Sequence, residues 1–136
     1  MFDWLKKKRP QGPGPDFSEI DSREKAERLF ADGALMKLHL LPPEFGGDDA
    51  PQNIVYVPAF VVDIKRGVDT NTIMPLAKDR KVTRYTATPK YQGRSFIPNS
   101  IEVRASNPGS FEMVIRIWGE ALREAEIAKS ERDPTK

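Results

Sequence analysis

The chain has 136 residues, 38% hydrophobic and 31% charged, which is the size and composition of one globular domain with a single core. It has no cysteine and one histidine, which excludes disulfides, a thiolate nucleophile, cysteine-based metal sites and sites built from several imidazoles. The net charge of +2 hides a segregation, because residues 16–64 carry −6 and residues 65–94 carry +6.

The longest apolar run, residues 54–62, is far shorter than the roughly 20 residues that a membrane-spanning helix needs. We therefore predict no transmembrane segment. The lack of cysteine is typical of proteins from a reducing compartment, and we expect a cytoplasmic location.

The N-terminal residues combine apolar side chains with a basic cluster. Phe2, Trp4 and Leu5 precede the basic run from Lys6 to Arg9, and no apolar stretch of signal-peptide length follows. Secretion is not expected. The pattern predicts at most a weak peripheral contact with an anionic membrane.

A proline- and glycine-rich stretch, residues 10–15, cannot continue a helix or a central strand and predicts a linker. We therefore divide the chain into a basic arm with its linker, residues 1–15, and one domain, residues 16–136.

Two elements are predicted at the start of the domain. Asp21 and Glu24 have the spacing of a helix N-cap with a capping box, which predicts a helix over residues 22–32. Residues 34–41 alternate between apolar and polar side chains and predict a strand that ends at Pro42. Residues 42–52, rich in Gly, Asp and Pro, predict a loop.

The next run is apolar on both faces. Residues 53–64, NIVYVPAFVVDI, predict one strand or two short strands covered on both sides, with Pro58 at an edge or a bulge. Residues 65–72 predict a turn.

Three further segments alternate with a period of two: residues 81–88, 95–104 and 111–118. The turn signal SNPGS between the last two predicts a hairpin. Residues 120–131 are rich in helix formers and predict a C-terminal helix. The expected fold is α+β, an antiparallel sheet of about five strands with the N-terminal and C-terminal helices packed on one face.

His39 lies at the end of a predicted strand, before a loop that contains Pro42, Gly46 and Gly47 and ends at Asn53. This stretch of about 19 residues resembles the core of HNH and related His-metal-finger nucleases. The resemblance implies that His39 is a general base that activates water and that Asn53 supports the finger. Such sites also carry a helix after the second strand, which the β-type run that follows Asn53 does not predict. An ordinary strand histidine is the alternative reading.

Three acidic side chains of the loop, Glu44, Asp48 and Asp49, carry oxygens that a hard cation such as Ca²⁺ or Mg²⁺ prefers. Their spacing differs from the calcium-binding loop pattern, and a solvated turn is the simpler interpretation. We predict no resident metal or cofactor.

The middle of the chain carries a basic set that could hold the phosphates of a nucleic acid: Lys78, Arg80, Lys81, Arg84, Lys90 and Arg94. Aromatic residues interleave with it, as they do on surfaces that bind single strands. The alternation predicts, however, that Arg84 and Lys90 point to solvent whereas Tyr85 and Tyr91 point to the core. A solvated face is the alternative.

No nucleotide-binding glycine loop, nucleophile elbow or paired-carboxylate site is recognisable in the sequence. We therefore expect a small non-catalytic interaction protein with an unknown protein partner. The start MFDWLKKK resembles that of many short bacterial immunity or accessory proteins. The alternatives are a nucleic-acid-binding module that uses residues 78–94 and a nuclease centred on His39.

Overall fold

The computed structural model describes residues 15–123. The predicted arm, with Phe2, Trp4 and the run from Lys6 to Arg9, lies outside the described residues, as does most of the predicted C-terminal helix, of which a helical turn over residues 120–123 is described. The principal elements are α2 (Arg23–Ala31), β1 (Met36–His39), β2 (Ile54–Val57), α3 (Ala59–Val68), α4 (Met74–Lys78), β3 (Arg84–Lys90), β4 (Ser100–Ser106) and β5 (Ser110–Arg116).

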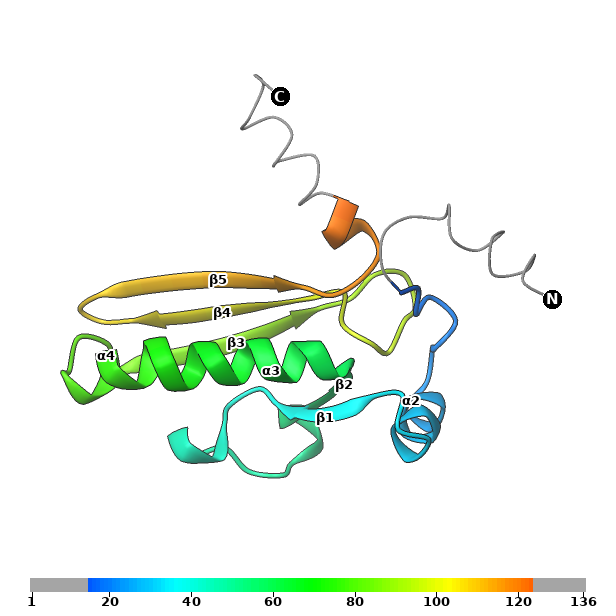
Figure 1. The fold of residues 1–136 in the computed structure, drawn as a ribbon, viewed down its shortest axis with the longest axis horizontal. Coiled ribbons are helices and arrows are strands. Elements are labelled where there is room, and N and C mark those ends of the chain that lie inside the picture. Colours follow the sequence, from blue (N-terminus) through cyan, green and yellow to red (C-terminus); the bar gives the residue numbers. More distant parts are fainter. Residues whose placement is uncertain (1–14, 124–136) are drawn as a thin grey trace, which may run out of the picture.

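The fold is α+β, as predicted, but the strands form two antiparallel sheets instead of one. β1 pairs with β2, and the other sheet has the order β3-β4-β5. Figure 1 shows α3 and the β1–β2 pair on one side of the three-stranded sheet. The single sheet of five strands is therefore wrong. Pro58, with φ −61°, follows β2 directly, and the chain turns there into α3.

The N-terminal helix is confirmed over Arg23–Ala31, although its cap differs by one residue from the prediction. The hydroxyl of Ser22 accepts the amide of Lys25, whereas Asp21 pairs with the ammonium of Lys25 at 2.9 Å. Ala26 is the buried residue of this helix. Ala26 therefore anchors the helix to the core, whereas Phe30 on the same helix is 37% exposed.

The strand predicted over residues 53–64 is confirmed for Ile54–Val57, which form β2, but is wrong after Pro58, where α3 begins and also replaces the predicted turn over residues 65–72. Helix α3 continues through a π-helical segment (Asp69–Ile73) into α4. The buried side chains of α3 and of the π-helical segment follow helical spacing, but two of the four are charged: Val61, Lys65, Asp69 and Ile73. For this reason the sequence shows no apolar period of 3.6 residues here. The β-branched residues of the segment favoured the prediction of a strand instead.

The predicted hairpin is confirmed as β4–β5, in which Ser106 pairs with Ser110 across the turn, although its first strand, predicted over residues 95–104, lies at Ser100–Ser106. The strand predicted at 81–88 lies instead at Arg84–Lys90. Its alternation is as expected, with Arg84 exposed and Tyr85 half-buried. Tyr91, predicted to face the core, is 49% exposed because it lies beyond the end of β3.

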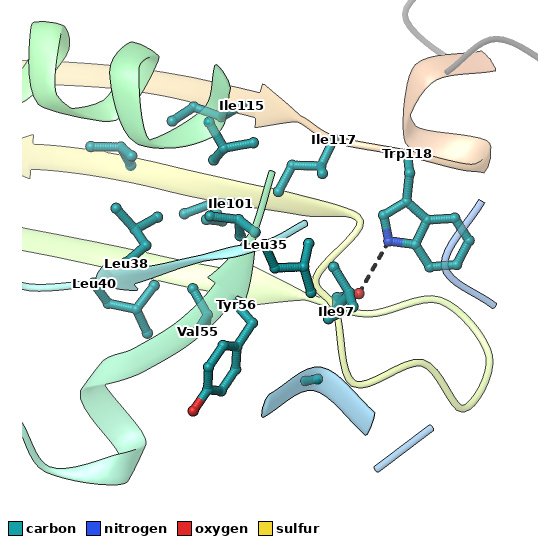
Figure 2. Close-up of a cluster of buried hydrophobic side chains, with 14 of the residues drawn as sticks. Leu35, Leu38, Leu40, Val55, Tyr56, Ile97, Ile101, Ile115, Ile117 and Trp118 are labelled. Atoms are coloured by element: carbon teal, nitrogen blue, oxygen red, sulfur yellow. Dashed lines mark hydrogen bonds between the residues drawn. The ribbon is translucent and has the colours of Figure 1, made fainter. Parts of the chain in front are cut away.

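The core lies between the two sheets (Figure 2). Leu38 and Val55 of the smaller sheet, together with Leu40 just after β1, share one buried cluster with Ile101 and Ile115 of the larger sheet. At one end of this cluster the indole of Trp118 donates a hydrogen bond of 3.1 Å to the carbonyl of Ile97. Within residues 15–123 no helix is both long and apolar enough to cross a bilayer.

Candidate functional site

The loop between β1 and β2 is fixed by the side chain of Asn53. Its carbonyl oxygen accepts the amide of Leu41 at 2.8 Å, and its amide nitrogen donates to the carbonyls of Leu41 and Asp48 at 3.0 and 2.8 Å. Gly47 passes so close to the carbonyl of Leu41 that a Cβ would collide with it. Asn53, singled out from the sequence, therefore holds the shape of the loop.

His39 contacts one acidic residue of this loop. Its Nε2 lies 2.7 Å from Oδ1 of Asp49, whose side chain is 89% exposed. Asp48 instead accepts the backbone amide of Ala50. Residues 15–123 contain no group of three His, Cys, Asp or Glu side chains arranged to hold a metal ion.

The helix that the nuclease resemblance requires after the second strand is present, contrary to the expectation from the sequence. α3 follows β2 after Pro58, which completes a strand–loop–strand–helix unit around His39. The α3 side chains that share a pocket with His39 include Lys65 and Arg66. Two cations at this place disfavour a bound metal ion by electrostatic repulsion.

Three buried or half-buried polar side chains form a hydrogen-bonded network: Lys65, Asp69 and Tyr85. The first two line the same pocket as His39. The ammonium of Lys65 donates to Oδ2 of Asp69 at 2.7 Å, one helical turn along the chain. The hydroxyl of Tyr85, on β3, donates to Oδ1 of Asp69 at 2.8 Å. Lys65 is 1% exposed and Asp69 5%. Both oxygens of a buried carboxylate are thereby satisfied.

Burial shifts the ionisation of this network. Removal from water lowers the pKa of the Lys65 ammonium below 10.5, and the neighbouring Asp69 carboxylate opposes that shift. Burial is also the largest cause that raises the pKa of Tyr85 above 10, followed by the charge of Asp69. The phenol therefore stays protonated and remains a donor. Sequence reasoning missed this network because the segment was predicted as strand and turn.

A small pocket of about 180 Å³ opens over Lys65 and Asp69, between β1 and α3. Leu38, Val62 and Pro42 contribute apolar surface to it, and its charged or titratable lining consists of Lys37, His39, Glu44, Lys65, Arg66 and Asp69. Of the proposed metal ligands only Glu44 reaches this pocket; the candidate general base His39 lines it as well. Small polar pockets with titratable groups of shifted pKa are candidate binding sites.

The six basic residues singled out from the sequence do not form one patch. Lys78 ends α4, Arg80 and Lys81 lie in the connection that follows, and Arg84 begins β3. Lys90 ends β3, six residues beyond Arg84, which is about 20 Å along an extended strand. Arg94 lies beyond Lys90 in the connection to β4. The basic set is therefore split between two ends of the sheet.

In the described part of the chain the larger sheet has two edge strands, β3 and β5, and neither pairs with a strand on its outer side. β5 pairs with β4, and no strand among residues 15–123 lies on its other side. The backbone amide of Asn107 donates to the carbonyl of Gly109 at the turn, and the amide of Ile117 donates to the carbonyl of Asn99 at the other end. Hydrogen-bonded and non-hydrogen-bonded pairs alternate along an antiparallel ladder, so the odd-numbered residues of β5 are the ones whose backbone bonds to β4. The backbone groups of Glu112, Val114 and Arg116 therefore point to the open edge.

Helix α3, which contacts β5, presents two exposed apolar side chains. Phe60 is 43% exposed and Ile64 39%, and their spacing places them on one flank of the helix. Val62 and Arg66 line the pocket beside β1, on the opposite flank. α3 contacts β5, and Figure 1 shows β5 as the strand farthest from β1. Phe60 and Ile64 therefore lie on the flank of α3 that faces away from the pocket beside β1.

Comparison with known proteins gives no relative. No family model matches the sequence, and neither curated proteins nor solved structures show a significant match.

Proposed function

We propose that this chain is a non-catalytic binding protein that engages a partner protein by adding a strand of the partner to the open edge of β5. The proposal rests on the presence of two features together. The outward backbone donors and acceptors of β5 have no partner strand among residues 15–123, and α3, which contacts β5, exposes an apolar flank. An added strand gains main-chain hydrogen bonds from such an edge. Natural proteins commonly protect open edges that are not used for binding.

The edge specifies the chemistry of the partner strand. Side chains on its inner face would pack against Phe60 and Ile64, so they are apolar. Side chains on its outer face would stand next to Glu112, Val114 and Arg116, and cross-strand pairs of opposite charge are favourable. The fitting segment alternates apolar residues with a polar face that carries a base opposite Glu112 and an acid opposite Arg116.

Substitution of Val114 tests the proposal. Val114→Pro removes the amide that points to the open edge and leaves the hydrogen bonds to β4 in place. Tagged protein would be used to capture partners from the native host with nuclease treatment of the captured material. Strand addition is supported if wild type and the control Val114→Thr capture the same partner protein and the variants Val114→Pro and Ile64→Asp do not. A protein captured equally by all variants contradicts it.

The same experiment addresses the nucleic-acid alternative. Lys78, Arg80, Lys81 and Arg84 gather where α4 passes into β3, and this concentration of charge favours contact with phosphates. We would replace the protein partner by a nucleic acid as the proposed ligand if wild-type protein captured nucleic acid with a steep salt dependence. The double variant Arg80→Gln with Arg84→Gln should then lose both the binding and its salt dependence.

The strand–loop–strand–helix arrangement around His39 keeps the nuclease candidate open. Cleavage of plasmid DNA with Mg²⁺ that His39→Ala abolishes would establish it and overturn the non-catalytic proposal. A role as a bacterial immunity or accessory protein is one form of the proposed binding, and a cytoplasmic location belongs to the same proposal.

A further inference from the structure

The pocket between β1 and α3 has unused hydrogen-bond donors at its base. A lysine ammonium has three N–H donors, and within residues 15–123 the hydrogen-bond partner of Lys65 is Asp69, at 2.7 Å. The ring of Tyr85 lies on another side, with its centroid 5.4 Å from Nζ. Because Lys65 lines the pocket, an acceptor that enters would meet a buried ammonium with spare donor capacity.

The charges of the lining favour an anion with a single negative charge. Lys37, Lys65 and Arg66 contribute three positive charges, and Glu44 and Asp69 contribute two negative charges, which leaves +1 for these five side chains. A carboxylate compensates that charge. A phosphate monoester carries about −1.5 to −2 at pH 7 and would be left with uncompensated charge beside Glu44 and Asp69.

The shape and the donors agree with this choice. Leu38 and Val62 supply apolar wall, which suits an aliphatic stem in a space of about 180 Å³. Arg66 is exposed at the rim, and a guanidinium binds a carboxylate through two parallel hydrogen bonds. We propose that this pocket is a binding site for a carboxylate on a short aliphatic stem, held by Arg66 and Lys65, with the stem against Leu38 and Val62. The site is separate from the β5 edge and does not depend on it.

Titration with butyrate tests the proposal, followed by amide chemical shifts of ¹⁵N-labelled protein. The expected result is a saturable shift of residues around the pocket, such as His39, Arg66 and Thr70. Arg66→Gln should weaken binding by about tenfold or more, because it removes the charge-assisted hydrogen bonds of the guanidinium, whereas the control Arg28→Gln, on α2, should leave it unchanged. Saturable binding that Arg66→Gln does not weaken would overturn the site.

Two further ligands test the chemistry. Butyramide has the same stem without the charge, and inorganic phosphate has charge without the stem; both should bind more weakly than butyrate. Equal binding of butyramide, or tighter binding of phosphate, would contradict the proposal, as would the absence of saturable shifts with butyrate. A second variant, Lys65→Met with Asp69→Leu, replaces the buried pair by apolar side chains and should lose butyrate binding although Arg66 is intact.

The carboxylate has two sources, a free acid or an acidic side chain of a protein. A capped peptide with a central glutamate separates them. Tighter binding of the peptide than of butyrate assigns the group to a protein, and tighter binding of butyrate assigns it to a small acid. Either result supports the carboxylate site, provided that butyrate itself binds saturably; failure of butyrate to bind overturns it.

Discussion

The ammonium of Lys65 and the carboxylate of Asp69 form an ion pair of 2.7 Å in the interior, where Lys65 is 1% exposed. Desolvation of two charges costs free energy that their attraction does not reliably recover, so well-packed apolar side chains stabilise a protein as much or more. The pair is therefore better explained by a role in binding, at the base of a pocket, than by a contribution to stability.

Replacing one member of this pair should be far more damaging than replacing both. Lys65→Met leaves the charge of Asp69 buried and uncompensated, and we expect a loss of about 3–5 kcal/mol in the free energy of unfolding. The double variant Lys65→Met with Asp69→Leu should recover most of this loss, although the hydroxyl of Tyr85 loses the nearer of its two acceptors and keeps the carbonyl of Leu40, at 3.4 Å. Urea denaturation of the three proteins measures both values. A double variant as unstable as Lys65→Met would contradict this view.

The raised pKa of Tyr85 predicts a loss of stability at alkaline pH. The folded protein keeps the phenol proton above pH 10, where the unfolded chain releases it, so the folded state binds more protons there and its stability falls as pH rises. Comparison with Tyr85→Phe isolates this effect. The advantage of wild type over the variant should shrink above pH 10, by at most about 1.4 kcal/mol per pH unit. An advantage that stays constant between pH 9 and 11 would count against the buried hydrogen bond to Asp69.

The β4–β5 hairpin and α2 were predictable because their signals are local. The turn residues SNPGS and the N-terminal polar residues before Ala26 specify each element within a few residues. α3 was not predictable from hydrophobic periodicity, because Lys65 and Asp69 occupy its buried side. The division into two sheets was also hidden, since pairing between strands distant in sequence depends on tertiary packing that alternation alone does not specify.

The candidate site was predicted only in part, for the same reason. His39 and Asn53 stand out in the sequence by residue type and spacing, and the structure gives Asn53 a scaffolding role. The contact of Tyr85 with Asp69 joins residues sixteen positions apart on different elements. Only the folded chain shows that these residues share one network.

Removal of the Asn53 side-chain amide should destabilise the loop between β1 and β2. Asn53→Ala loses three hydrogen bonds, two to Leu41 and one to Asp48, and we expect a loss of about 2–3 kcal/mol in the free energy of unfolding. Gln52→Ala, at an exposed neighbouring position, is the control and should change stability by less than about 0.5 kcal/mol. Thermal or urea unfolding followed by circular dichroism measures both. Equal stability of the two variants would show that the loop does not depend on Asn53.

Two glycines of opposite environment offer a matched pair of substitutions. At Gly47 a Cβ would collide with the carbonyl of Leu41 and lie 3.0 Å from the side-chain nitrogen of Asn53, so Gly47→Ala should displace the loop and cost about 2 kcal/mol or more. At Gly67, inside α3, no atom lies within 4 Å of an added Cβ, and Gly67→Ala should stabilise the helix by up to about 1 kcal/mol. The midpoints of urea unfolding should therefore move in opposite directions. Destabilisation by Gly67→Ala would mean that the outer side of α3 is covered in solution, and a neutral Gly47→Ala would mean that the loop can shift away from Leu41 at little cost.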